Sequence, residues 1–145
     1  MNGHMASQYR ALAARANYLA PDRPGIQFVT KELCRDMSEP KGRSWTAMKR
    51  LGRYLQSHPR HVQEYRRQGR QGDITTWVEP EYVGCVRTRP STSGGALCLG
   101  KHVINTWSST QKVIALSVGE AYYYGVVKGT AMGKGTQSLI KGFWG

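Results

Sequence analysis

The sequence predicts an α+β protein in which a helical segment precedes a β-sheet that packs against one helix. Up to about residue 57, apolar side chains recur at helical spacing, and after Pro59 they form short runs separated by glycine-rich turns. From about residue 119 the spacing is helical again. Because helices and strands occupy separate stretches of the chain, we expect an α+β arrangement divided into residues 8–58 and residues 59–145.

The helical segment is predicted to contain three helices. Residues 8–20 are rich in alanine, leucine and arginine, which favour helix. A second helix is predicted over residues 24–38, with Asp22 as its N-cap and Pro24 in its first turn, where a missing N–H costs nothing. A third helix is predicted over residues 43–57. Its buried side is expected to hold Trp45, Met48, Leu51 and Leu55.

The second part of the chain is predicted to form strands. Residues 61–66 and 74–82 alternate loosely in polarity and are joined by a glycine-rich turn, which predicts a β-hairpin. Two further strands are predicted at Ala96–Leu99 and Val103–Trp107, joined by a turn at Gly100-Lys101.

The last helix is predicted to start near residue 119, after an apolar run at Val113–Leu116 that is a candidate extension of the sheet. Glu120 lies in its first turn, where the helix dipole stabilises a negative charge. Three glycines recur at every fourth position along it: Gly125, Gly129 and Gly133. Each costs roughly 1 kcal/mol of helix propensity, so we expect either close packing against another element or a weak helix. Residues beyond about 134 are predicted to be poorly ordered.

The formal net charge of +12 predicts attraction to polyanions, of which nucleic acid is the commonest large one. The excess is concentrated in residues 1–71, where 14 basic residues outnumber 5 acidic ones. On the third helix, the side opposite the apolar one carries cations and no acid, which favours contact with phosphate. These cations are Arg43, Lys49, Arg50 and Arg53. The alternative is a solvated basic surface without a specific partner.

A second candidate phosphate site is the stretch R-T-R-P-S-T-S-G-G at residues 87–95. It combines Arg87 and Arg89 with hydroxyls and backbone N–H groups, all of which bind phosphate oxygens. The alternative is a polar hairpin loop in which Gly94-Gly95 supplies the turn geometry.

Several classes of protein are disfavoured by the sequence. Three widely spaced cysteines do not form a disulfide framework, and they share no metal-ligand spacing with the four histidines. No apolar run approaches the roughly 20 residues that a membrane helix needs, and no signal peptide is recognisable. We therefore expect an intracellular protein that does not enter a membrane.

The residues in both parts of the chain carry a family resemblance. In the helical segment the matching residues are Tyr9-Arg10, Leu12, Tyr18-Leu19-Ala20, Arg23-Pro24, Ile26, Trp45, Lys49-Arg50 and Arg53-Tyr54-Leu55. Farther on they are residues 87–95, Trp107–Gln111 and Leu116–Tyr124. In this order they resemble the Pol polyprotein of copia-type retrotransposons, from the end of the reverse transcriptase region to the start of the ribonuclease H domain.

The resemblance implies reverse transcription and cleavage of the RNA strand of RNA–DNA hybrids, with Mg²⁺ ions held by carboxylates. The family's first strand reads V-D-S-D-W-A-G, and residues 78–84 align with it. This places Glu79 at a metal-ligand position, with a longer side chain than aspartate and with Pro80 next to it, which a central strand tolerates poorly. The family's helix start reads S-S-x-E-A-E and aligns Tyr122 with another ligand, although a phenol with a pKa near 10 cannot replace a carboxylate.

The carboxylate set is therefore incomplete, since no aspartate or glutamate follows Glu120, which we interpret as a helix-start residue. We interpret the chain as a polyprotein fragment in which residues 8–58 resemble the reverse-transcriptase thumb and connection. Residues 59–145 resemble a truncated ribonuclease H with a mixed β-sheet and one packing helix. We expect no catalysis by this chain alone and no bound metal, although Mg²⁺ is the family's cofactor.

The expected partners are nucleic acid, which in the family is an RNA–DNA hybrid, and the rest of a Pol polyprotein. Two alternatives remain at this point. One is a basic module that binds nucleic acid without cutting it, and the other is a relic without a selected activity.

Overall fold

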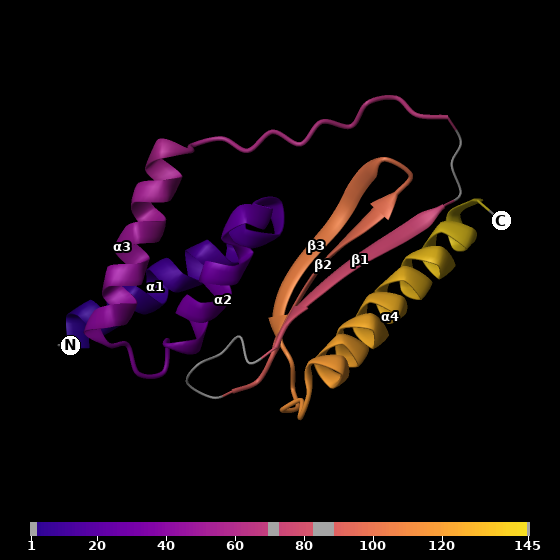
Figure 1. The fold of residues 1–145 in the computed structure, drawn as a ribbon. Helices are drawn as coiled ribbons and strands as arrows, with labels where there is room; N and C mark the ends of the chain where they lie inside the picture. Colours follow the sequence, from indigo (N-terminus) through magenta and orange to yellow (C-terminus); the bar gives the residue numbers. More distant parts are fainter. Residues whose placement is uncertain (1–2, 70–72, 83–88, 145) are drawn as a thin grey trace. The chain divides into compact units, whose positions relative to one another are not determined.

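The computed structural model describes residues 3–69, 73–82 and 89–144, and it divides the chain into two compact units, residues 1–64 and 65–145. The first unit is helical, and the second contains a three-stranded sheet with a long helix (Figure 1). The predicted α+β class is confirmed.

The first unit contains three α-helices, as predicted, with different bounds. They are α1 (Gly3–Leu19), α2 (Gln27–Arg35) and α3 (Gly42–Ser57), and two 3₁₀ turns, η1 (Ala20–Asp22) and η2 (Pro24–Ile26), separate α1 from α2. Because Pro24 begins a 3₁₀ turn, α2 is shorter than the predicted helix. The prediction that Asp22 caps α2 is wrong, since Asp22 ends η1 and Ile26 occupies the N-cap position of α2.

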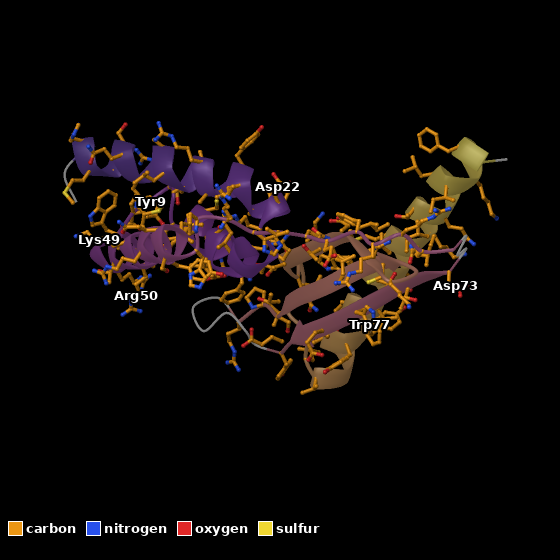
Figure 2. The ribbon with its side chains drawn as sticks, turned by 90° about the horizontal axis from the view of Figure 1, so that it is seen from above. Tyr9, Asp22, Lys49, Arg50, Asp73 and Trp77 are labelled. Carbon is orange, nitrogen blue, oxygen red and sulfur yellow. The ribbon has the colours of Figure 1, made fainter. Side chains whose placement is uncertain are left out.

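The three helices share one hydrophobic core. Its buried members are Tyr9, Ala13, Ala16, Ala20, Ile26, Leu33, Met48 and Leu51. The labelled Tyr9 projects from α1 (Figure 2), is fully buried, and donates its hydroxyl to the Leu33 carbonyl oxygen at 2.8 Å. This bond satisfies the phenol where water cannot reach it and fixes α1 against α2.

Two arginines bind backbone carbonyls at the ends of the other helices. The Arg10 Nε donates to the Met37 carbonyl oxygen at 2.8 Å, just beyond the end of α2. The Arg23 guanidinium donates to the carbonyl oxygens of His58 and Pro59, just beyond the end of α3. A cation at a helix C-terminus satisfies carbonyls that lack a partner within the helix and interacts favourably with the helix dipole.

The second unit contains strands β1 (Ile74–Glu81), β2 (Thr92–Leu99) and β3 (His102–Thr110). Their order is β1-β2-β3, and both pairs are antiparallel, so the described sheet is antiparallel rather than mixed. The predicted turn between β2 and β3 is confirmed, with Gly100 at a φ of 58° that favours glycine. The apolar run at residues 113–116 does not extend the sheet.

The predicted hairpin between residues 61–66 and 74–82 is wrong, because residues 58–69 contain no strand. Two side chains fasten this segment to the turn between β2 and β3 instead. The Gln68 amide donates to the Leu99 carbonyl oxygen at 2.9 Å and accepts from the Lys101 backbone N–H at 2.9 Å. The Tyr65 hydroxyl donates to the Val103 carbonyl oxygen at 3.2 Å. Side-chain hydrogen bonds to the β2–β3 turn and to β3, rather than backbone pairing with β1, therefore hold this segment.

Helix α4 (Val118–Trp144) lies along one face of the sheet (Figure 1), and Gly125, Gly129 and Gly133 lie against β1. A Cβ on Gly129 would lie 2.5 Å from Val78 Cγ2, and one on Gly125 would lie 3.0 Å from Val78 Cγ1. A Cβ on Gly133 would lie 3.0 Å from Thr76 Oγ1. The prediction of close packing is thus confirmed. The prediction of poor order beyond residue 134 is wrong, since the helix continues to residue 144.

Gly94 and Gly95 lie within β2, so the alternative in which they supply a turn is wrong. Gly95 is paired with Trp107 of β3, and a Cβ at this position would overlap the Trp107 indole and approach the Trp77 carbonyl oxygen at 2.6 Å. Glycine is therefore needed here because a tryptophan ring occupies the space above it.

Candidate functional site

The two residues that the resemblance aligns with metal ligands contact each other. Glu79 is an exposed residue of β1, and Tyr122 extends from the first turns of α4. The Tyr122 hydroxyl donates to Glu79 Oε1 at 3.2 Å. The negative charge of Glu79, followed by this hydrogen bond, raises the pKa of Tyr122, so the phenol stays protonated and acts as a donor.

Glu120 belongs to the start of α4. Ser117 Oγ accepts from the Glu120 backbone N–H at 3.1 Å, and Glu120 Oε2 accepts from the Leu116 backbone N–H at 2.7 Å. Serine and glutamate at this spacing resemble a capping box, with the glutamate reaching one residue farther back than usual. The Leu116 bond, and next the bond from the Tyr124 hydroxyl, lower the pKa of Glu120. Its carboxylate is therefore already used in holding the helix start.

These residues do not fit a two-magnesium centre. All nine acidic residues of the chain lie in its described part, and that part contains no group of three or more potential ligands placed to hold a metal ion. Glu79 accepts a hydrogen bond from a phenol, and Glu120 is bonded to backbone and to Tyr124. Mg²⁺ requires several oxygen ligands in near-octahedral geometry. No catalytic step through a metal can be derived from this arrangement.

Pro80 is compatible with β1 because β1 is an edge strand. The Gly100 backbone N–H donates to the Asp73 carbonyl oxygen at 3.0 Å, so Asp73 and every second residue after it point their backbone groups toward β2. Pro80 falls at the alternate positions, which point to the free edge. Its missing N–H therefore costs the β1–β2 ladder nothing.

The stretch at residues 87–95 does not form a polar loop throughout. Ser91, Thr92 and Ser93 are buried, with Ser91 fully inaccessible. Arg89 is exposed and adopts a left-handed φ of 61°, whereas Arg87 lies outside the described residues. Among the described residues of this stretch, Ser91 and Thr92 are enclosed in the unit, Ser93 lines a cleft of the unit, and Arg89 is exposed on its surface.

The four selected cations of α3 lie together on its outer side. Arg43, Lys49, Arg50 and Arg53 are all exposed, and among the described residues none of them forms an ion pair with an acid. Figure 2 labels Lys49 and Arg50, whose side chains extend from α3 on the side away from α1. Met48 and Leu51, on the opposite side, are buried in the core. The helix therefore presents four uncompensated positive charges on a firmly anchored side.

Sequence reasoning missed a second group of polar residues, in the unit that contains the sheet. The buried Gln111 donates through Nε2 to Ser93 Oγ and to the Ala121 carbonyl oxygen, both at 2.9 Å. The half-buried Lys128 of α4 donates to Ser109 Oγ of β3. The partners lie 10 to 19 residues apart in the chain, so spacing within the sequence gave no signal for them.

Over 120 residues, 83% of its length, the chain is 30% identical to the retrovirus-related Pol polyproteins from transposons RE2 and RE1 of Arabidopsis thaliana. It spans only 8% of the length of these polyproteins. It is also 29% identical to secreted RxLR effector protein 161 of Plasmopara viticola, over 83% of this chain and 84% of that protein.

No protein-family profile and no solved structure matches the chain. Within the described residues, no helix has the length and apolar character needed to traverse a bilayer. With 120 residues matched, the similarity to the two polyproteins extends over both units. The chain is accordingly a homologue of a segment of retrotransposon Pol polyproteins.

Proposed function

We propose that the chain is a non-catalytic segment of a copia-type Pol polyprotein that binds nucleic acid through the outer side of α3. In this proposal residues 1–64 derive from the end of the reverse transcriptase region. Residues 65–145 derive from the start of a ribonuclease H domain that has lost its metal centre.

The observation that carries the proposal is the set of four exposed, unpaired cations on α3. The hydrophobic core holds α3, and Arg23 binds at its C-terminal end. The backbone that carries these charges is therefore already ordered, and it loses little conformational freedom when a ligand binds. Neutralising phosphates with such cations releases counterions, which drives binding without dependence on sequence.

The lack of catalysis is supported by the Tyr122–Glu79 hydrogen bond. A phenol stands where the family has a carboxylate ligand, and it bonds to the one family-position carboxylate that remains. In a cleavage assay with a labelled RNA–DNA hybrid and millimolar Mg²⁺, we expect no product above the level of a buffer control. Turnover that Glu79→Ala abolishes would disprove this part of the proposal.

Binding is tested by the salt dependence of affinity for an RNA–DNA hybrid, measured by fluorescence anisotropy. Replacing Arg43, Lys49, Arg50 and Arg53 by glutamine should lower the slope of log K against log salt by about 3.6, at about 0.9 per lost contact on a duplex. A matched variant, with glutamine at Arg15, Lys101, Lys134 and Lys141, loses the same total charge from other places. Equal effects of the two variants would show that net charge, rather than the α3 side, governs binding.

A further inference from the structure

We infer that a cleft in the second unit binds a phosphomonoester attached to an apolar or aromatic body of nucleotide size. The cleft has a volume of about 500 Å³. Its lining includes Ser93, Ser109, Gln111, Lys112, Tyr124 and Lys128. This volume lies within the range typical of small-molecule sites and exceeds what a free inorganic ion fills. The inference does not depend on the proposed binding by α3.

Lys128 is the central cation of the cleft. Its ammonium group donates to Ser109 Oγ, and two of its three N–H bonds are left to bind a ligand. Burial lowers the pKa of Lys128, and no acidic partner offsets that effect. A half-buried ammonium without a counter-charge costs free energy, and an anion bound beside it would recover part of this cost.

Two serine hydroxyls lie beside Lys128. Ser93 and Ser109 are directly paired across β2 and β3. Ser93 Oγ accepts from Gln111, and Ser109 Oγ accepts from Lys128. Each hydroxyl therefore keeps its own proton to donate. The Gln111 amide cannot be flipped, because its nitrogen also donates to the Ala121 carbonyl oxygen, which can only accept. Gln111 thus holds Ser93 in place as a donor.

The charges around the cleft favour an anion. Lys112 is exposed and adds a second positive charge to the lining. No carboxylate is among the lining residues. Glu120 is bonded to the Tyr124 hydroxyl, which leaves mainly the ring of Tyr124 as a wall of the cleft. Two cations and two hydroxyl donors suit a phosphate dianion, while Val113 and the tyrosine ring suit an apolar or aromatic body.

The test is calorimetric titration of the full chain with thymidine 5′-monophosphate, thymidine and inorganic phosphate. We expect binding of the nucleotide, weaker binding of phosphate and none of thymidine. Lys128→Met keeps most of the side-chain volume and removes the charge, so the nucleotide should bind at least about tenfold more weakly. Lys141→Met, on the exposed side of the same helix, should leave its affinity unchanged.

A second variant keeps the test decisive if Lys128→Met alters the fold. Ser109→Ala preserves the charge and removes one donor, and it should weaken nucleotide binding by a smaller factor. Millimolar nucleotide without detectable heat, equal affinity for inorganic phosphate, or equal effects of the Lys128 and Lys141 variants would overturn the inference.

The phosphate could belong to a free nucleotide or to the end of a strand, and NMR distinguishes these sources. Perturbation of the Gln111 side-chain amide by a 5′-phosphorylated oligothymidine, but not by the unphosphorylated strand, would assign the cleft to a strand end. Perturbation by the nucleotide alone would assign it to a free nucleotide. Both results support the cleft as a phosphomonoester site, and an amide unmoved by either ligand contradicts it.

Discussion

Replacing Gly129 by alanine should destabilise the second unit, although the same change stabilises most helices. Alanine at an exposed helical glycine gains about 1 kcal/mol of helix propensity. At position 129, however, the new Cβ would lie 2.5 Å from Val78 Cγ2 and 3.1 Å from Thr76 Cγ2. Both neighbours are β-branched and have restricted rotamers, so α4 must move away from β1.

The matched control is Gly135→Ala in the same helix, since a Cβ at Gly135 has no neighbour within 4 Å. Forcing a methyl group into a packed interface costs about 1–3 kcal/mol. The two alanine variants should therefore differ by about 1–3 kcal/mol, with Gly135→Ala the more stable. For a unit of this size, that difference corresponds to a shift in Tm of at least about 4 °C.

The assay is thermal and urea unfolding followed by circular dichroism, with hydrogen exchange of α4 amides to assign the change to the second unit. The double variant Val78→Ala/Gly129→Ala removes the clashing methyl groups. Its effect should be smaller than the sum of the two single effects by about 0.5–3 kcal/mol. If Gly129→Ala stabilised the protein as much as Gly135→Ala does, α4 could not lie against β1 as described.

Three further predictions concern single side chains. Gly95→Ala should prevent native packing of the sheet, because the methyl group overlaps the Trp107 indole; an unchanged near-ultraviolet spectrum would contradict this. Tyr9→Phe should cost the first unit about 1 kcal/mol in urea unfolding, since the Leu33 carbonyl oxygen loses one of its two donors and keeps the Asp36 backbone N–H, and Tyr18→Phe, an exposed control, should cost nothing measurable. Glu120→Gln should be less stable than the parent at neutral pH. Because folding lowers the pKa of Glu120, its charge stabilises the fold above the pKa of the unfolded chain, and this gain is lost as pH falls through the folded value. The two unfolding curves should converge in acid, and a constant difference down to pH 2 would exclude this cause.

The helices of the first unit could be predicted because their signals are local. Apolar side chains at helical spacing placed α3 within one residue of its observed start, Gly42. The η1 and η2 turns were missed because a proline suits the first turn of a 3₁₀ helix and of an α-helix equally. Distinguishing the two requires the packing of Ile26 in the core, which local sequence does not contain.

The errors in the second unit arise from contacts between distant residues. Gly94-Gly95 has the composition of a turn, and only the pairing of Gly95 with Trp107 shows why glycine is required within a strand. Residues 61–66 alternate in polarity, yet the neighbour of β1 is β2, which lies farther along the chain. The cleft around Lys128 combines α4 with β2 and β3, so it exists only once the register of the sheet is set.

The absence of aspartate and glutamate after Glu120 could be recognised from sequence, because it is a direct count. The hydrogen bond between Tyr122 and Glu79 could not be recognised from sequence, since the two residues lie 43 residues apart. The outer side of α3 could be predicted in part. Its charges are visible in the sequence, whereas their exposure and their lack of acidic partners among the described residues are known only from the structure.

The arginines that bind helix ends affect how similarity to this chain should be used. Tyr9, Arg10 and Arg23 are among the residues that carry the family resemblance in the sequence, and each is engaged with a main-chain oxygen. Natural selection for folding alone would retain them after an enzyme had decayed. Similarity that rests on such positions therefore indicates a shared scaffold, and it carries no information about the residues of an active site.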